Sequence, residues 1–523
     1  MLHLLSRLSG YLPALVALAL PTVFTTAASD SFILPRASIV IAGACLGIAL
    51  ALLIPGGPGL ASLRWPLLAA AATALLAFIF SISQALSLAG SYTRYESLPM
   101  RLSYLGLLAA SVWLLRTQRQ RDWVVAAFVF STAVACLEAV QQSAGHVAFR
   151  PDGNLGNANL LAALVAMATP LAIYRGLRGG RFVLAWWAAL IVLGFGLFVT
   201  TSRSGLLGTL AGCAALGAFS IRPRRLAAAA GIAGVAVVGA AAAFIQLSPL
   251  RALNDDPASL RLHLWQDGLH MIAARPITGW GEDTTGLAFG QFLSQDYASL
   301  VTFDRVHSGP LDIAATQGIL GLAALALILV VLFVAAWHHR LAPGTAALAA
   351  ALVGYSVWVV FNFDWAPATG AFWVLAGTLW SGTSPPHPVG RSAEGRVGSR
   401  AWQSGLAVIL VIAGTILAVF PLLADAWYVR GRADLAVKVD PYQAQYHWAL
   451  GEGLIARGDL AGGTVELQRA ADLGETEPGL YVELGDRQAE LGNRAEARAD
   501  YRRALVIDPF YTPAQQRLAA LGA

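Results

Sequence analysis

Two arginines and one histidine stand out because this chain has few charged side chains. Arg203 lies in a Thr-Ser-Arg-Ser-Gly run, Arg261 lies four residues before Trp265, and His307 begins a His-Ser-Gly run. A guanidinium group stays charged and binds phosphate oxygens through a planar fork. A neutral imidazole accepts protons near neutral pH. Together these side chains could stabilise a phosphorylated leaving group and activate a hydroxyl group for attack.

The composition of the chain is that of an integral membrane protein. Of 523 residues, 57% are hydrophobic and 12% are charged, and the mean hydropathy is +0.62. A soluble domain has about twice that charged fraction. The net charge of +5 does not indicate a nucleic-acid partner, because most arginines lie in short loops between apolar runs. Cys45, Cys136 and Cys213 lie within apolar runs without CxxC spacing, which argues against a disulfide framework and a zinc site.

Thirteen apolar segments are long enough, or nearly so, to cross a bilayer core of about 30 Å. We therefore expect an all-α fold, a polytopic transmembrane helical bundle with about 13 spans. The first segment could be mistaken for a signal peptide, but its basic region is weak and further spans follow, so we interpret it as a helix. The segments are 11–28, 37–54, 66–89, 102–115, 123–142, 158–174, 182–200, 205–220, 226–247, 310–336, 345–361, 367–381 and 405–424.

The charges of the loops predict how the chain is oriented. Arginines gather in alternate loops, such as the one at 116–121, whereas the other loops carry acids such as Asp30 and Glu96. The positive-inside rule places the N-terminus in the cytoplasm, and an odd number of spans places the C-terminus outside. This assignment does not use the three motifs, yet it puts all of them on the extracytoplasmic side. It also makes the long loop 248–309 the outer catalytic loop.

The composition becomes charged and helical after the last span, which divides the chain into a membrane domain, 1–424, and a second domain, 425–523. The second domain repeats with a spacing of 34 residues and resembles tetratricopeptide repeats. Such arrays bind proteins or peptides, so we expect a protein partner here rather than catalysis. The matching positions are Leu450 with Leu484, Gly451 with Gly485, Gly458 with Gly492, and the series Ala436, Ala470 and Ala504.

Five blocks of residues occur in a fixed order between about residues 150 and 340. They are Gly156 to Ala162, Thr201 to Arg203, Arg261 with Trp265, Pro276 to Gly281, and His307 with Gln317 to Gly321. In this order and spacing the membrane domain resembles the O-antigen ligase superfamily. That superfamily includes lipopolysaccharide O-antigen ligases, Wzy-type polysaccharide polymerases and bacterial O-linked oligosaccharyltransferases.

The resemblance implies a reaction and its catalytic residues. A glycan carried on undecaprenyl diphosphate would be transferred to a hydroxyl acceptor, without a metal or another cofactor. Arg203 and Arg261 would bind and stabilise the diphosphate, and His307 would take the proton of the acceptor hydroxyl. The chain departs from the family at Ser308, because many members have Asn after this histidine.

Further residues are candidates for substrate binding. Arg275 and Arg305 could contact phosphate or sugar groups. Asn157 and Asn159 could contact sugar hydroxyls, although capping of the next helix is favoured because Asn is a preferred N-cap residue. Trp280 lies in a Gly-Trp-Gly turn and could stack on a sugar ring. Clustered carboxylates that would recommend a metal site are missing from the sequence.

The sequence therefore predicts a glycosyltransferase of surface polysaccharide assembly, including lipopolysaccharide, in the bacterial inner membrane, surrounded by membrane lipids. The second domain would be periplasmic. Lipid A–core, a glycan or a protein could supply the acceptor hydroxyl, so O-antigen ligase, Wzy-type polymerase and protein O-oligosaccharyltransferase all remain open. A transporter of lipid-linked glycan would have charges deep within its spans and pseudo-symmetric halves, and neither is seen. A scaffold that recruits the assembly machinery would not need the three motifs.

Overall fold

The computed structural model describes residues 8–54, 57–147, 149–247, 258–297, 302–383 and 397–522. Within these ranges the secondary structure is helical and contains no β-strand. This confirms the expected all-α class.

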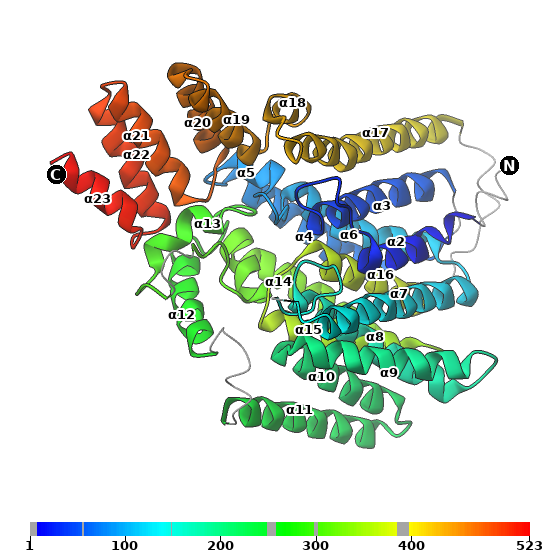
Figure 1. The fold of residues 1–523 in the computed structure, drawn as a ribbon. Coiled ribbons are helices and arrows are strands. Elements are labelled where there is room, and N and C mark those ends of the chain that lie inside the picture. Colours follow the sequence, from blue (N-terminus) through cyan, green and yellow to red (C-terminus); the bar gives the residue numbers. More distant parts are fainter. Residues whose placement is uncertain are drawn as a thin grey trace.

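Twelve of the thirteen expected apolar segments each overlap a single helix, and the other, 66–89, overlaps two; the long helices lie side by side as a bundle (Figure 1). Eight helical segments of the described chain are long and apolar enough to cross a membrane, which supports a multi-pass membrane protein. The figure of about 13 spans stays a prediction. The bundle helices are α2 (Leu12–Thr22), α3 (Ile33–Leu53), α4 (Arg64–Ile79), α6 (Leu98–Leu114), α7 (Gln118–Ala144), α8 (Ala158–Arg178), α9 (Val183–Thr200), α10 (Arg203–Ser220), α11 (Arg224–Leu247), α14 (Gly309–His338), α15 (Thr345–Val360), α16 (Ala366–Thr383) and α17 (Val397–Tyr428).

Helices at the centre of the bundle are more buried than helices at its edges. In α16 every residue from Ala366 to Ser381 is buried, and α8 is buried along most of its length. By contrast α11 and α17 lie at opposite edges of the bundle, where most of their apolar side chains are exposed (Figure 1). Such apolar surfaces are stable only against lipid or another protein.

One expected span is interrupted. We predicted a single helix over 66–89, but α4 ends at Ile79 and a short helix, α5 (Gln84–Ala89), follows. The oxygen of Ser83 caps α5 by accepting a hydrogen bond from Leu86 N, and Ile82 N donates to the carbonyl of Trp280 at 3.1 Å. Hydrophobicity alone does not report such polar contacts, so the prediction of one continuous helix was wrong.

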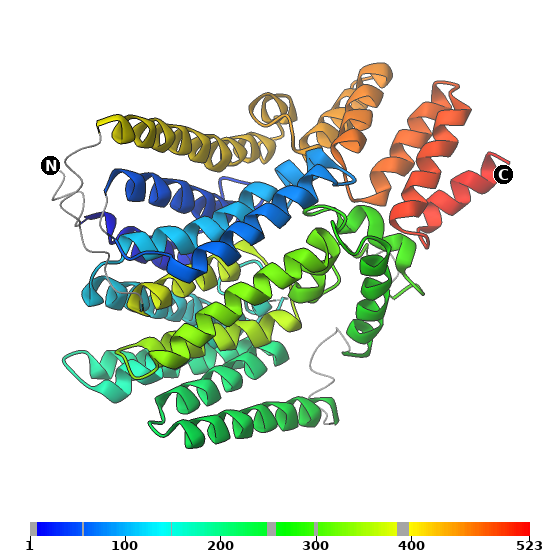
Figure 2. The same ribbon diagram turned by 180° about the vertical axis from the view of Figure 1, so that it is seen from behind.

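The loops of the bundle gather at two ends (Figure 2). At one end, Arg116 donates to the carbonyl of Ile54 and Arg340 donates to the carbonyl of Arg222. The opposite end holds the loop 361–365, the residues that follow α5, and the segments 258–297 and 302–308. This grouping of loops agrees with the alternation expected from the sequence. Which compartment each end faces stays a prediction.

The Pro-Ile-Thr-Gly-Trp-Gly motif, Pro276 to Gly281, forms backbone hydrogen bonds with α14 near a break in that helix. Gly318 has a φ of 72° within α14, and the backbone just before this break accepts bonds from the motif. Trp280 N donates to the carbonyl of Ala315 at 2.9 Å, and Gly281 N donates to that of Thr316 at 3.0 Å. The motif is therefore fixed against the first half of α14.

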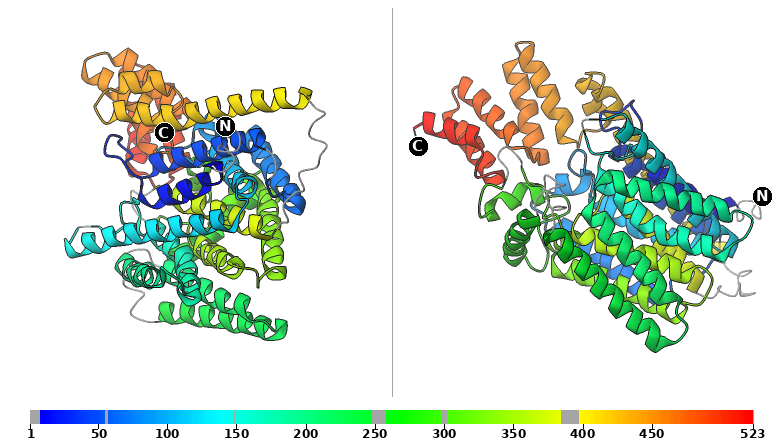
Figure 3. Two further views of the ribbon diagram at one scale, coloured as in Figure 1. Left: turned by 90° about the vertical axis from the view of Figure 1, so that its right-hand side faces the viewer. Right: turned by 60° about the horizontal axis from the view of Figure 1, so that its bottom comes forward.

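The region after α17 is a row of paired helices that projects from one end of the bundle (Figures 1 and 3). Helix α19 pairs with α20 and α21 pairs with α22, and α19, α21 and α23 begin 34 residues apart. Gly451 and Gly485 lie against Gly463 and Tyr501 of the partner helices, where a Cβ would be too close. Their assignment as tetratricopeptide repeats stays a prediction. The helices are α18 (Ala433–Val439), α19 (Ala444–Ala456), α20 (Leu460–Leu473), α21 (Pro478–Glu490), α22 (Arg494–Ile507) and α23 (Thr512–Ala520).

The paired helices pack directly on the segment that precedes His307. This segment includes α13 (Thr285–Ala288) and the 3₁₀ turn η3 (Phe289–Phe292). A Cβ on Gly290 would lie 1.9 Å from the carbonyl oxygen of Ile507, at the end of α22. A Cβ on Gly286 would lie 3.0 Å from the side chain of Thr476. The second domain is therefore seated on the part of the chain that we expected to carry catalysis.

Candidate functional site

Arg203 begins α10, directly after a tight corner between α9 and α10. Thr201 ends α9 in the left-handed conformation, with φ 51°, and the Ser202 side chain caps α10 by accepting from Gly205 N. The helix N-terminus carries a partial positive charge. The half-buried Arg203 side chain adds a full charge at the same place.

Asn157 and Asn159 join the start of α8 to this corner. Asn157 is the N-cap of α8 and accepts a hydrogen bond from Asn159 N at 2.8 Å, as the capping interpretation predicted. The Asn159 side-chain oxygen accepts from the hydroxyl of Ser202 at 2.8 Å and from Arg150 at 3.3 Å. Asn159 therefore helps to hold the corner that presents Arg203, whereas the Asn157 side chain caps α8.

Arg261 and Trp265 lie one turn apart on α12 (Ala258–Ala274). Arg261 Nη1 donates to the carbonyl of Phe361 at 2.5 Å. The ring of Trp265 lies 6.0 Å from the ring of Phe361, and its Nε1 donates to the carbonyl of His307 at 3.4 Å. Helix α12 thus links the histidine to the end of α15.

His307 is held in a backbone conformation that is uncommon for residues other than glycine. Its φ is 59°, a left-handed value that persists only where its surroundings enforce it. Asp312 supplies part of this enforcement, because its Oδ1 accepts from Val306 N at 2.8 Å and its own N donates to the carbonyl of Ser308 at 2.7 Å. Asp312 therefore contacts the backbone on either side of His307.

The loop 361–365, between α15 and α16, is where the three motifs meet. Asn362 Nδ2 donates at 3.0 Å to the hydroxyl of Ser204, the neighbour of Arg203. Phe361 accepts from Arg261, as described above, and the ring of Phe363 lies 5.4 Å from the ring of His307. The structure therefore brings all three predicted catalytic residues to one short loop.

Buried ionic groups surround the inner side of this loop. The Arg101 guanidinium lies 2.7 Å from Asp364, 3.6 Å from Glu282 and 3.9 Å from Glu96, and all four side chains are largely buried. Burial raises the pKa of Glu96 to about 8, although Arg101 opposes the shift. Burial likewise raises the pKa of Glu282. The neutral form of Glu96 is therefore favoured at neutral pH. As a result, the three carboxyl groups around Arg101 do not all carry a negative charge.

A second ionic group lies on the outer side of the loop. The guanidinium of Arg94 lies 5.0 Å from the ring centre of Phe363 and 4.6 Å from that of Trp365. Its Nε also donates to Asp304 at 2.5 Å. Burial alone would raise the pKa of Asp304, but Arg94 and Arg305 outweigh it and lower this pKa. Asp304 is therefore a fixed anion close to His307.

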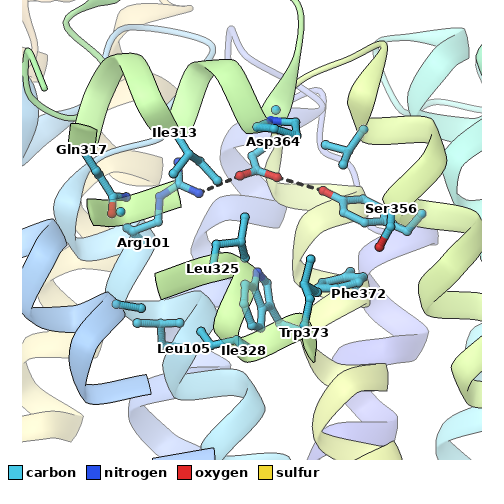
Figure 4. Close-up of a pocket in the computed structure, with 17 residues that line it drawn as sticks. Arg101, Leu105, Ile313, Gln317, Leu325, Ile328, Ser356, Asp364, Phe372 and Trp373 are labelled. Atoms are coloured by element: carbon cyan, nitrogen blue, oxygen red, sulfur yellow. Dashed lines mark hydrogen bonds and ion pairs between the residues drawn. The ribbon is translucent and has the colours of Figure 1, made fainter. Parts of the chain in front are cut away.

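An apolar cavity of about 110 Å³ opens beside these groups, between α4, α6, α14, α15 and α16 (Figure 4). Its polar end carries Arg101, Gln317 and Asp364, and Figure 4 shows Arg101 and Asp364 joined by a hydrogen bond. Leu325 and Trp373 are among the side chains that form the apolar part. Gly309 and Pro310, which follow the His-Ser pair, also line it.

The other predicted substrate-binding residues lie in protein contacts. Arg305 is buried and forms an ion pair with Asp283. Arg275 lies with its guanidinium 4.5 Å from the ring centre of Trp280, and Trp280 Nε1 donates to the carbonyl of Met271 at 3.0 Å. Arg275 and Trp280 are thus brought together as a cation–π pair, and Arg305 is occupied by a carboxylate.

The sequence analysis missed Arg94, Arg101 and Asp364. The spacing of these residues matches no motif, and only packing of the loop 361–365 against the segment 91–101 reveals them. The one available signal was their position in outer loops of the predicted topology. Across the described ranges, no group of three or more His, Cys, Asp or Glu residues could hold a metal ion.

Comparison with known proteins supports the resemblance over part of the chain. A family model described as O-Antigen ligase matches residues 188–326. The match runs from α9 into α14 and contains Arg203, Arg261 and His307, while the loop 361–365 lies outside it. No curated protein matches the chain. The match supports a membrane enzyme of the O-antigen ligase superfamily that handles glycans, of the ligase or polymerase kind.

Proposed function

We propose that this protein is a membrane glycosyltransferase of the bacterial inner membrane. It transfers a glycan from an undecaprenyl-diphosphate-linked donor to a hydroxyl acceptor during surface polysaccharide assembly, as an O-antigen ligase does. The observation that carries the proposal is the meeting of Arg203, Arg261 and His307 at the loop 361–365. In this proposal the loop and the second domain face the periplasm.

The arginines stabilise the leaving group. Attack at the anomeric carbon breaks its bond to the diphosphate, so negative charge grows on the departing oxygen. Arg203 at the N-terminus of α10 and Arg261 on α12 offer fixed positive charges and planar donors to that oxygen and its neighbours. Because the arginines supply this charge, the step needs no metal ion.

His307 activates the acceptor. A neutral imidazole removes the proton of the acceptor hydroxyl as its oxygen attacks the anomeric carbon. The backbone contacts of Asp312 and Trp265 hold this residue in its left-handed conformation. Such backbone strain is found at functional sites, where the surrounding structure enforces it.

The cavity beside the loop suits the isoprenoid chain of the donor. It is lined mainly by apolar side chains of the bundle and ends at Gly309 and Pro310, close in sequence to His307. An apolar chain that enters it from the bilayer would bring its diphosphate to the loop 361–365. Arg101 stands at the polar end of the cavity, where it is paired with Asp364.

The acceptor decides between the three members of the reaction class. The test incubates purified full-length protein with lipid-diphosphate-linked repeat units alone, and product length is measured by mass spectrometry. Chain growth identifies a polymerase. Product that appears only after lipid A–core is added identifies a ligase, and product that appears only with a protein acceptor identifies a protein O-oligosaccharyltransferase.

Variants test the site in the same assay. His307→Asn removes the base but keeps a side chain that tolerates a left-handed backbone, and we expect at least a hundred-fold loss of rate. Arg203→Ala and Arg261→Ala should lose activity similarly. Arg178→Ala and His338→Asn are matched controls, because both residues are exposed at the opposite end of the bundle. Full activity of the His307→Asn variant would refute the proposed mechanism.

A further inference from the structure

A second cavity, of about 90 Å³, lies at the end of the bundle opposite the candidate site, where α8 and α16 end and α7 and α15 begin. A single buried water needs about 10–15 Å³ measured in this way, so the cavity has room for a group of the size of a phosphate. Val125 of α7 and Leu348 of α15 form part of its wall. None of its lining residues belongs to the three motifs or to the loop 361–365.

The lining of this cavity carries more positive than negative charge. Arg121, Arg175 and Arg178 line it together with one carboxylate, that of Asp122. Arg175 Nη1 lies 3.2 Å from Asp122, so these two charges balance. Arg178 is exposed and donates to the hydroxyl of Tyr174 at 2.9 Å, and water and salt screen an exposed charge. The half-buried Arg121 therefore supplies the charge that the lining does not balance.

Uncharged oxygens hold the guanidinium of Arg121 in place. Its Nε and Nη2 donate to the side-chain oxygen of Gln118 at 3.3 and 3.1 Å, and its Nη1 donates to the carbonyl of Ser381 at 3.4 Å. Each terminal nitrogen of a guanidinium carries two N–H groups, so these bonds leave donors for a further acceptor. A guanidinium binds phosphate oxygens through such a planar pair of donors.

The N-terminus of α15 adds positive potential to the same cavity. Gly344 is the N-cap of α15, and both Gly344 and Thr345 line the cavity. A glycine has no side chain to accept from the amide groups of the first turn, and the N-cap makes no side-chain bond. Such amide groups carry a partial positive charge and bind anions. The charge of α7 and the start of α15 therefore both favour an anion here.

A phosphate group can reach this cavity from two sources. The predicted topology places this end of the bundle in the cytoplasm, where the membrane surface carries anionic lipids. Trp123 and Leu177 follow Asp122 and precede Arg178 in the chain, and they are 49% and 72% exposed. Acyl chains could pack on such apolar side chains while the head group enters the cavity. A free phosphate ion could enter directly from water.

We propose that this cavity binds a phosphate group, held by the guanidinium of Arg121 and by the first amide groups of α15. The phosphate belongs to the head group of an anionic lipid or to a free phosphate ion. This site lies at the other end of the bundle from the loop 361–365, and its test does not depend on glycosyl transfer.

Two binding measurements on delipidated full-length protein test the proposal and separate the two sources. Native mass spectrometry compares a phosphatidic acid with a diacylglycerol of identical acyl chains, so the two probes differ only in the phosphate group. Isothermal titration calorimetry adds inorganic phosphate to protein in a phosphate-free buffer. Retention of the phosphatidic acid at least tenfold above that of the diacylglycerol identifies a lipid, and saturable binding of inorganic phosphate identifies a free ion. Equal retention of the two lipids together with no binding of inorganic phosphate would overturn the proposal.

Variants locate the bound phosphate. Arg121→Gln removes the charge, and we expect the phosphate probe to bind at least about tenfold more weakly. Arg121→Lys keeps the charge but loses the planar pair of donors, so its loss should be smaller, about threefold. Arg119→Gln is the matched control, because Arg119 is exposed near the start of the same helix and does not line the cavity. Equal losses in Arg119→Gln and Arg121→Gln would mean that the general surface charge attracts the phosphate, which would overturn the proposed site.

Discussion

Replacement of Asp425 by alanine should release the second domain from the bundle. Asp425 is fully buried near the end of α17. Its carboxylate accepts hydrogen bonds from Asp30 N at 2.9 Å, from the hydroxyl of Tyr92 at 2.8 Å and from that of Tyr446 at 3.1 Å. Tyr446 lies on α19, so this single side chain ties two loops of the bundle to the first helix pair of the second domain.

The expected magnitude follows from the three donors. A buried donor left without a partner costs about 1–3 kcal/mol, so Asp425→Ala costs at least about 3 kcal/mol. Since 1.4 kcal/mol changes an equilibrium tenfold, local opening of α18 and α19 should become roughly a hundred-fold more frequent. Asp425→Asn keeps one acceptor oxygen and should have a smaller effect.

Hydrogen–deuterium exchange of peptides from residues 433–456 measures this opening directly. Asp434→Ala is the control, because Asp434 is an exposed carboxylate on the next helix, α18, and forms an ion pair with the exposed Arg432. We expect faster exchange in Asp425→Ala and no change in Asp434→Ala. Protection in Asp425→Ala within about threefold of the parent would mean that Asp425 does not fasten the second domain.

Three further predictions concern stability and activity. Burial raises the pKa of Glu475 to about 7, so its protonated form is favoured in the folded state. Protein stability therefore falls as pH rises from about 4.5 to 7, by up to about 1.4 kcal/mol per pH unit. Glu475→Gln should be more thermostable than the parent at pH 8, with a much smaller difference at about pH 4, and the same difference at both pH values would contradict this. Gly290→Ala places a Cβ 1.9 Å from the carbonyl of Ile507, so it should lower the melting temperature and speed exchange in α22, whereas an unchanged melting curve would show that the contact can relax. Arg94→Lys loses the planar stacking on the rings of Phe363 and Trp365 and one of the two hydrogen bonds to Asp304. The value of kcat/KM in the glycan assay should therefore fall about tenfold. A parental rate would show that Arg94 does not position the loop 361–365 for activity.

Much of the architecture could be predicted from the sequence because it depends on hydrophobic periodicity. The apolar runs predicted each bundle helix, and the alternation of loop charge predicted which loops share an end. The interruption after Ile79 could not be predicted, because it depends on the Ser83 cap and on a bond to the carbonyl of Trp280. The Ser83 cap is local but polar, and Trp280 is distant in the sequence, so hydropathy records neither contact.

The candidate site was predictable where its residues form motifs. Arg203, Arg261 and His307 lie in recognisable runs, and the structure gathers them at one loop, although their catalytic role stays a prediction. Arg101 and Asp364 are single residues more than 250 positions apart in the chain, and only tertiary packing makes them partners. Arg305 illustrates the reverse case, because a plausible phosphate ligand in the sequence is an ion-pair partner of Asp283 in the fold.

The close packing of Gly286 and Gly290 against the second domain also bears on the order in which the protein is made. Synthesis proceeds from the N-terminus, so the ribosome makes α22, which contacts Gly290, only after every helix of the bundle. The segment before His307 therefore reaches its final packing only when α22 has folded against it. A chain whose synthesis has not yet reached α22 would hold all three motif residues but not the finished surface around them.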